Sequence, residues 1–426
     1  MSQKLALHGG EPVIRQPFPP YRSIGEEEAA AAGRVLRSGV LSAYVGAAGE
    51  GFMGGPEVRA LEQEAAAYFG VRHAIAVNSL TSGLIAAVGA LGVEPGDEVI
   101  VTPWTMAASA TAIVHWNAIP VFADIDPDTY TLDPQAVERC VTPRTRAIMA
   151  VDIFGQPADM EALAEVARRH SLRLISDAAQ APGARYRERY AGTCADIGGY
   201  SLNYHKHIHC GEGGILVTDE ERYAERLRLI RNHAEAVIRA DSPAGLANMI
   251  GYNFRLGEIE SAITREQLKK LADKVASRQQ AAARVSAGLG SLPGLSLPKV
   301  RAGCTHVYYV YGMKFDTARL GVSRDAIVAA LRAEGVSGLG AGYQNIHRLP
   351  MFTQGVAYGT RGFPWAGVAG VAPRESTSAC PVAERLHTRE FFYLGLCAHE
   401  YPESETQLLV AAFHKVWENL GSLRSS

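Results

Sequence analysis

From about residue 56 the chain alternates between two hydrophobic periods. The segment PEVRALEQEAAAYF (56–69) has apolar residues at helical spacing, and AIAV (74–77) is a short apolar run typical of a buried strand. The alternation continues to about residue 178. It predicts helices over 80–91, 106–116 and 159–170 and strands over 98–101, 120–125, 146–154 and 173–178. This pattern favours an α/β fold with a mostly parallel sheet, whose ligands bind beyond the carboxyl ends of the strands.

A surface helix is predicted over TDEERYAERLRLIRNH (218–233). Thr218 is followed three residues later by Glu221, which is the pattern of a capping box. We therefore expect this helix to begin at Thr218.

A second, smaller α+β domain is expected in the C-terminal part of the chain. Residues 258–291 form a long charged helical stretch that bridges to it, and HVYYVYGMKF (306–315) alternates like an antiparallel strand. Residues 355–378 are rich in Gly, Ala, Pro and Ser and predict a long loop. The expected division is a large domain over 1–257 and a linking helix with the small domain over 258–426.

Composition excludes several classes of partner. The chain has 426 residues, with 42 Lys and Arg against 44 Asp and Glu, and the charges form no long run of one sign. Such a balance does not indicate binding to nucleic acid or to an anionic membrane surface. We read no signal peptide, no apolar run long enough to cross a bilayer and no CxxC spacing among the six cysteines. We expect a cytoplasmic enzyme with small-molecule partners.

The segment NYHKHIHCGEGG (203–214) could hold a metal ion or present an amine. If residues 201–209 are extended, His205, His207 and His209 share one face and Lys206 lies on the other. A histidine row can bind zinc or copper, but no carboxylate accompanies it. Histidines that face solvent or an interface are the plainer alternative, and we expect no metal site.

The amine interpretation gives Lys206 a chemical role. A lysine among potential cations and near a glycine-rich turn is a candidate for a lowered pKa and for Schiff-base chemistry. Pyridoxal phosphate (PLP) would also need a carboxylate at its ring nitrogen, donors for its phosphate and a flat or apolar side chain over its ring.

The chain contains each of these groups. Asp177 ends the apolar run RLIS, 29 residues before Lys206, and Gln180 follows it closely. NSLTSGL (78–84) joins a strand to a helix, so the amides of Thr81 and Ser82 lie where an anion is favoured. Ser201 adds a hydroxyl. Taken singly, Asp177 could be a helix cap and Thr81 a helix start, whereas the set together is far more specific for PLP.

Motifs along nearly the whole chain resemble one family. They are GGPEVRALE (54–62), VNSLTSGL (77–84), GDEVIVTP (96–103), PVFADID (120–126), ISDAAQAPGA (175–184), SLNYHKHIHCGEGGILVTD (201–219), GYNFRLGEIESA (251–262) and CPVAERL (380–386). The chain is similar to the DegT/DnrJ/StrS-type PLP-dependent aminotransferases that aminate keto-sugars and aminocyclitol precursors. The resemblance implies the PLP-dependent transferase fold type I, with a large PLP domain and a smaller C-terminal domain. It also implies a homodimer with shared active sites.

The resemblance assigns roles position by position. Lys206 would bind PLP covalently and shuttle the proton, and Asp177 would pair with the ring nitrogen. Gln180 would contact the ring oxygen. The residues that would hold the phosphate are Thr81, Ser82, Ser201 and Asn253, the last from the neighbouring subunit. The related sugar 3-dehydratases carry histidine in place of the lysine, so Lys206 favours an aminotransferase.

Two positions depart from the family pattern. Leu80 stands in the phosphate turn where glycine is common. The residue that stacks on the ring is often aromatic, whereas PWTMAAS (103–109) holds Met106 there and Trp104 two residues earlier. Either side chain could cover the ring, and a core role for Trp104 is the alternative.

The resemblance implies transfer of an amino group from glutamate or glutamine to a ketone. The expected acceptor is a nucleotide-linked keto-sugar, and a free cyclitol ketone of the inosose type is the runner-up, because LALHGGEPV near the amino terminus is similar to that of inosose aminotransferases. Residues 340–350, with Tyr343 and His347, are expected to contribute to the acceptor pocket. A non-catalytic PLP- or sugar-sensing regulatory protein is the alternative from another class.

Overall fold

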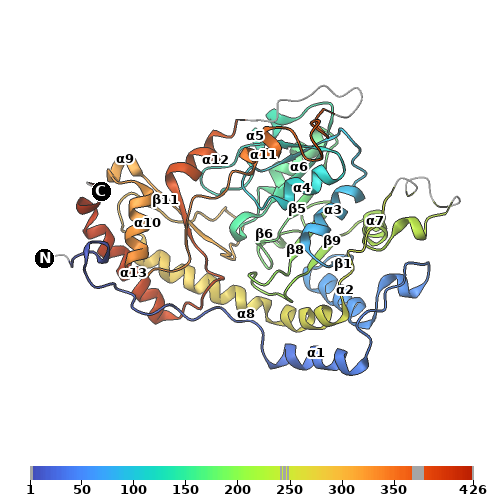
Figure 1. The fold of residues 1–426 in the computed structure, drawn as a ribbon, viewed down its shortest axis with the longest axis horizontal. Coiled ribbons are helices and arrows are strands. Elements are labelled where there is room, and N and C mark those ends of the chain that lie inside the picture. Colours follow the sequence, from blue (N-terminus) through green and yellow to red (C-terminus); the bar gives the residue numbers. More distant parts are fainter. Residues whose placement is uncertain (1–2, 240–241, 243–245, 247–248, 367–378, 425–426) are drawn as a thin grey trace.

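The central feature of the fold is a seven-stranded sheet (Figure 1). The computed structural model describes residues 3–239, 242, 246, 249–366 and 379–424. In spatial order the strands are β1 (His73–Val77), β9 (Gly214–Thr218), β8 (Ile197–Ser201), β5 (Arg173–Asp177), β4 (Thr145–Val151), β2 (Glu98–Val101) and β3 (Ile119–Phe122). Only β9 runs antiparallel to its neighbours. The predicted α/β class with a mostly parallel sheet is confirmed.

Helices cover both faces of this sheet, which explains why consecutive residues in the middle of its strands are apolar. On one face lie α3 (Leu80–Ala90), α4 (Ala108–His115) and α7 (Glu221–Arg231). The other face is covered by α2 (Pro56–Phe69), α5 (Pro134–Cys140) and α6 (Met160–Arg169). In β4, Met149 packs on the first face and the adjacent Ile148 on the second. The two faces therefore have separate apolar layers.

The long helix α8 (Glu258–Leu289) joins this sheet to a second, smaller one (Figure 1). The second sheet is antiparallel, in the order β10 (Leu295–Ser296), β11 (Tyr311–Phe315), β13 (Phe391–Leu394) and β12 (Leu339–Ala341). Around it lie α9 (Thr317–Leu320), α10 (Arg324–Ala333), α11 (Pro350–Thr353), α12 (Pro381–Arg385) and α13 (Glu403–Glu418). Leu271 of α8 packs in the core under the large sheet and Val285 in the core of the small one. The domain boundary at 257/258 stays a prediction.

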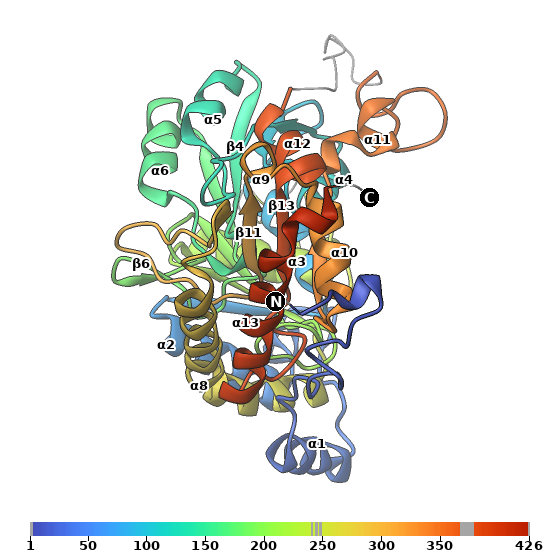
Figure 2. The ribbon, with the colours of Figure 1, turned by 90° about the vertical axis from the view of Figure 1, so that its left-hand side faces the viewer.

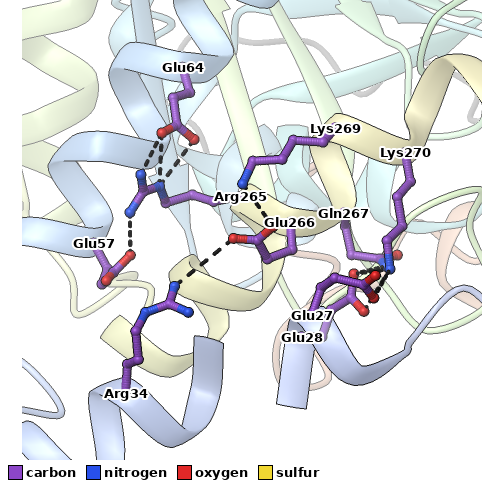
Figure 3. Close-up of polar contacts among 10 residues, drawn as sticks. All are labelled: Glu27, Glu28, Arg34, Glu57, Glu64, Arg265, Glu266, Gln267, Lys269 and Lys270. Carbon is purple, nitrogen blue, oxygen red and sulfur yellow. Dashed lines mark hydrogen bonds and ion pairs between the residues drawn. The ribbon is translucent and has the colours of Figure 1, made fainter. Parts of the chain in front are cut away.

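Ion pairs hold α1 (Glu26–Ser38) and α2 against α8 (Figure 3). Arg265 of α8 binds Glu57 and Glu64 of α2, and Lys270 of α8 binds Glu28 of α1. Between these pairs the buried Gln267 donates to Glu28 Oε1 at 2.7 Å and accepts from the backbone N–H of His209 at 3.2 Å. The start of α8 is therefore linked to the segment that carries Lys206.

The amino-terminal arm, residues 3–25, crosses the small domain before α1, and both ends of the chain lie at that side of the molecule (Figure 2). Glu334, which is buried, fastens the arm by accepting from the backbone N–H groups of Ala6 at 2.8 Å and Val13 at 3.1 Å. The Lys415 ammonium lies 2.9 Å from the same carboxylate. A buried ion pair thus anchors the arm.

We expect Glu334→Ala to lower the free energy of unfolding by about 3–5 kcal/mol, because it leaves the Lys415 charge buried without its partner. Chemical denaturation of the full-length protein measures this loss. Glu418→Ala, at an exposed position of the same helix as Lys415, is the control and should change stability by less than about 0.5 kcal/mol. Equal losses in the two variants would contradict the anchoring role.

Two local predictions are wrong and one is only partly tested. Helix α7 begins at Glu221, because Thr218 ends β9 and its hydroxyl donates to the Asp196 carbonyl at 2.7 Å instead of capping a helix. The predicted strand 306–315 starts only at Tyr311, since Tyr308 has a left-handed φ of 52° that interrupts extended backbone. Of the predicted loop 355–378, residues 367–378 lie outside the described residues. No helix in the described ranges is long and apolar enough to cross a membrane.

Candidate active site

Lys206 lies in a cavity of about 370 Å³ at the carboxyl ends of the parallel strands. Asp177 ends β5 and Ser201 ends β8, and both line the cavity. Tyr309 and Tyr343 close it from the C-terminal part of the chain. The cavity is therefore at the edge of the sheet where ligands of α/β proteins bind.

The lysine amine is buried, and within the described part of the chain no carboxylate forms an ion pair with it. Lys206 is 7 % exposed, and its Nζ lies 4.2 Å from the centre of the Tyr309 ring. Burial lowers the pKa of Lys206 to about 8, although the Asp177 charge acts in the opposite direction. Part of the amine is therefore uncharged and nucleophilic near neutral pH.

Asp177 presents a buried carboxylate to the cavity. It is 3 % exposed, and it accepts from Ser109 Oγ at 2.8 Å and from the backbone N–H of Ala179 at 3.1 Å. Burial raises the pKa of this carboxyl, whereas the two hydrogen bonds and the Lys206 charge lower it. No helix begins in the residues after β5, so Asp177 is not a helix cap. A cationic group in the cavity would stabilise its charged form.

Gln180 is held in one orientation. Its Oε1 accepts a hydrogen bond from the backbone N–H of Phe154 at 2.7 Å. The side-chain NH2 group therefore points the other way and donates to the Tyr343 hydroxyl at 3.4 Å. Both Gln180 and Tyr343 line the cavity. This pair can donate to an oxygen of a ligand.

The amino end of α3 lies at the cavity wall and supplies anion donors. Ser79 caps the helix by accepting from the backbone N–H of Ser82 at 3.1 Å, and the two hydroxyls lie 3.0 Å apart. Ser79 and Thr81 line the cavity, whereas Ser82 does not. The predicted Ser82 is thus bonded to the cap, and Ser79 is a cavity residue that the sequence reasoning missed. The serine directly before an apolar helix was the available signal.

Leu80 can stand in the turn because its side chain points into the core. It is 5 % exposed, and a Cβ on Gly199 would lie 2.6 Å from its Cδ1. Likewise, a Cβ on Gly214 would lie 2.8 Å from the Leu80 backbone nitrogen. Glycines on the neighbouring strands thus leave the room that Leu80 needs.

Trp104 and Met106 have different surroundings. Trp104 is fully buried, donates from Nε1 to Asn345 Oδ1 at 2.6 Å and packs on Phe391 at 4.9 Å between ring centres. It does not line the cavity, so it is not retained as a cofactor-binding residue. Met106 is 69 % exposed and lines the cavity. The apolar side chain available to cover a ring from this segment is therefore Met106.

The histidines do not form a row. Residues after Ser201 make a turn instead of continuing β8, so the extended backbone that would align the three rings is absent. His205 is exposed and lines the cavity, whereas His207 is fully buried and its Nε2 lies 2.8 Å from the Val307 carbonyl oxygen. Among the described residues no group of His, Cys, Asp and Glu could hold a metal ion.

Comparison with known proteins decides the family. A family model described as the DegT/DnrJ/EryC1/StrS aminotransferase family matches residues 24–369. The chain belongs to this family. It is an aminotransferase, and its fold is that of the PLP-dependent fold type I enzymes.

Two curated relatives of this DegT/DnrJ/EryC1/StrS aminotransferase are similar over most of their length. The spore coat polysaccharide biosynthesis protein SpsC of Bacillus subtilis (strain 168) is 35 % identical in an alignment of 358 positions, which covers 82 % of this chain and 89 % of the relative. A putative L-glutamine:3-amino-2,3-dideoxy-scyllo-inosose aminotransferase of Streptoalloteichus tenebrarius is 34 % identical over 439 residues, which span 100 % of both chains.

Two solved structures have the same fold as this chain. DesV of S. venezuelae, in complex with a ketimine intermediate, matches with a TM-score of 0.78 and 31 % identity over 95 % of this chain and 99 % of its own. DesI, determined in the presence of its TDP-sugar product, matches with a TM-score of 0.79 and 30 % identity over 99 % of both chains.

The cavity of the aminotransferase fits PLP by the chemistry of its donors. The buried carboxylate of Asp177 can accept a hydrogen bond from a protonated pyridine nitrogen and stabilise the positive charge of the ring. The N–H groups of Leu80 and Thr81, the first two of α3, have no intrahelical acceptor and can bind phosphate together with the hydroxyls of Thr81 and Ser201, whereas the N–H of Ser82 is bonded to Ser79. Gln180 presents its NH2 group, and Lys206 its amine, to the same space.

Besides Ser82 and Trp104, two further predicted residues of the aminotransferase lie outside this cavity. Asn253 is exposed, does not line the cavity of its own chain and accepts through its carbonyl from Asn78 Nδ2 at 3.4 Å. Its role toward the phosphate of a neighbouring subunit stays a prediction. His347 is fully buried, with Nε2 3.0 Å from Glu384, so it does not line the pocket as Tyr343 does. Tyr309 was missed as a site residue, and an aromatic pair just before a strand was the only signal.

We expect the Lys206 amine in PLP-free protein to react with acetic anhydride at lower pH than ordinary lysines. Below its pKa the amine is protonated and inert, and above about pH 8 it is free to react. Lys299 is the comparison, because a hydrogen bond to Asp128 raises its pKa. Peptide mass spectrometry over a pH series measures both sites at once. If Lys206 reacts only at the pH where Lys299 does, its burial in the cavity is wrong.

Proposed function

We propose that this aminotransferase binds PLP through Lys206 and transfers an amino group from glutamate or glutamine to the ketone of a sugar. The observation that supports it is the meeting of a buried amine, a buried carboxylate and a helix amino end in one cavity. When bound, PLP supplies an aldehyde that accepts the amino group and a ring that takes up electrons from the carbon bearing it.

The chain's own residues would position the reactants and move the proton. The Lys206 Nζ, which is partly uncharged near neutral pH, would carry a proton from the substrate carbon to the C4′ carbon of the cofactor, and in the opposite direction in the second half of the cycle. Asp177 would accept a hydrogen bond from the protonated ring nitrogen, and Gln180 would donate to the ring oxygen. Thr81, Ser201 and the amides of α3 would hold the phosphate. The Tyr309 ring limits the directions that the amine can take.

The proposed acceptor is a nucleotide-linked keto-sugar, and the proposed assembly is a homodimer in the cytoplasm, with Asn253 contributed by the partner subunit. The structure of DesI in the presence of its TDP-sugar product supports this acceptor class through a relative that covers nearly the whole chain. A cyclitol ketone is the second candidate, because the putative inosose aminotransferase aligns with this chain from end to end.

The test is the half-reaction run in reverse. PLP-loaded protein is mixed with a panel of nucleotide-linked amino sugars and free aminocyclitols, and the loss of PLP absorbance is followed. Conversion of the first group alone supports the nucleotide-linked acceptor, and conversion of the second group alone replaces it with the cyclitol. Glutamate-dependent amination of any ketone rules out a non-catalytic sensor. Borohydride treatment and peptide mapping that place the pyridoxyl label anywhere but Lys206 would refute the proposed function.

A further inference from the structure

The amino-terminal arm contacts the backbone of the lysine turn directly. The Tyr21 hydroxyl donates to the carbonyl oxygen of His207, the residue that follows Lys206. Burial raises the pKa of Tyr21, so its hydroxyl stays protonated and remains a donor. Neither residue lines the cavity, and neither has a part in the proposed function.

The arm is rigidly placed at this point. The backbone N–H of Tyr21 donates to the Ala398 carbonyl at 3.2 Å, and Pro20 forms an antiparallel bridge with His399. Arg278 of α8, which is 1 % exposed, places its guanidinium 4.3 Å from the centre of the Tyr21 ring and donates to the His399 carbonyl at 2.9 Å. The Tyr21 hydroxyl is therefore held by the small-domain chain and by α8 together.

His207 holds the other side of the turn. Burial lowers its pKa to about 4, so the ring is neutral at pH 7 and carries one N–H. Since a carbonyl oxygen can only accept, that proton is on Nε2 and is donated to Val307 at 2.8 Å. Val307 lies two residues before Tyr309, whose ring faces the Lys206 amine. One side chain thus joins the lysine turn to the segment that carries the ring.

We propose that Tyr21 and His207 are positioning residues, which hold the turn of residues 202–210 so that the Lys206 amine stays over the Tyr309 ring. The inference rests on the proposed function only for the role of Lys206. Loosening either contact should let water reach the amine and let the amine leave its reacting position. A displacement of about 1 Å at a reacting group can cost up to about a hundredfold in rate.

The experiment compares Tyr21→Phe, His207→Leu and His207→Gln in full-length protein. The first two remove one hydrogen bond each, and glutamine restores an N–H donor near the position of Nε2. Tyr311→Phe and His414→Gln are matched controls, because Tyr311 Oη lies 2.7 Å from Ser286 Oγ and His414 Nε2 lies 2.8 Å from the Gly288 carbonyl, both outside the cavity. Thermal melting verifies that each variant is folded.

The first readout is the pH at which Lys206 is acetylated in PLP-free protein, which needs no turnover. Tyr21→Phe and His207→Leu should raise the apparent pKa of Lys206 by about one unit, because the amine becomes better hydrated. Asp177 and the buried Cys397 raise the pKa of this amine, and neither is altered. His205 and His207 also interact with the Lys206 charge, and of these two only His207 is replaced. Its ring is neutral at pH 7, so its removal takes no charge from the site at that pH. The second readout is steady-state kinetics, in which kcat should fall about tenfold and KM should change less than about twofold.

His207→Gln should return the apparent pKa of Lys206 to within about half a unit of wild type and kcat to within about threefold. The two controls should leave both readouts unchanged. The proposal is overturned if Tyr21→Phe and His207→Leu behave as wild type, or if the controls shift the acetylation pH equally. A wild-type protein that carries PLP on another residue would instead refute the proposed function. The acetylation comparison among variants would remain interpretable in that case.

Discussion

Replacing Lys206 by alanine should abolish amination, with kcat/KM lower by at least about 10⁴-fold, because covalent attachment and proton transfer depend on the same amine. Among the described residues Lys206 is the only lysine or arginine that lines the cavity, so no neighbouring amine is placed to replace it. The measurement is steady-state amination with a ketone that the panel identifies, at saturating PLP.

Two variants separate this effect from general damage. Lys269→Ala removes an exposed lysine of α8 and should leave activity within about twofold of wild type. Lys206→Arg retains the positive charge but not a titratable amine, and it should be as inactive as the alanine variant. Activity of the arginine variant within tenfold of wild type would show that the amine has only an electrostatic role.

The large sheet was the most predictable part of the fold. Strand β2 (Glu98–Val101) has the predicted bounds, and α6 (Met160–Arg169) differs from its prediction by one residue at each end. Strands buried on both faces read as unbroken apolar runs, and an amphipathic helix has a clear period, so local sequence was sufficient. The antiparallel strand β9 was not predicted as a strand, although it lies between β1 and β8 and pairs with both.

Local pattern failed where tertiary contacts chose between two allowed structures. Thr218 suits a helix cap, but its hydrogen bond to Asp196 across the sheet makes it the end of a strand. The histidine segment suits a strand, but long-range contacts hold it as a turn: His207 Nε2 lies 2.8 Å from the Val307 carbonyl oxygen, and the backbone N–H of His209 donates to Gln267 at 3.2 Å. Each competing partner lies on a different part of the fold, so a local pattern cannot weigh it.

The candidate site also contains residues that the sequence could predict and residues that only the fold brings there. Asp177 could be placed in advance, because a predicted parallel strand ends there at the ligand edge of the sheet. Ser201 was suggested by its hydroxyl and by the family resemblance, but β8, which brings it to the same edge, was not predicted as a strand. Which of Ser79 and Ser82 reaches the cavity depends on the rotation of the first turn of α3. The partners that hold Trp104 in the core include Phe391 and Asn345, and Asn345 is 241 residues away. Tyr309 comes from beyond α8, and nothing in the residues near Lys206 indicates it.

Replacing Asp177 by asparagine should reduce kcat by about 10²–10³-fold and also weaken PLP binding. The carboxylate is 3 % exposed and receives hydrogen bonds from Ser109 and Ala179, so the amide fits the space but carries no charge to match a protonated ring nitrogen. Removing a charge that stabilises the reacting state in a buried site typically costs this much. Fluorescence titration with PLP and steady-state amination measure the two effects.

Asp152→Asn is the matched control, because Asp152 is also a fully buried carboxylate at the end of a neighbouring strand but does not line the cavity. It accepts from the backbone N–H of Ala158 and from Ser176 Oγ, both at 2.8 Å, so the same change should affect stability without a comparable loss of PLP affinity. Ser109→Ala, which removes one donor to Asp177, should have an intermediate effect of about tenfold. If Asp152→Asn and Asp177→Asn lower kcat and PLP affinity equally, the loss reflects folding, and Asp177 has no special role at the ring nitrogen.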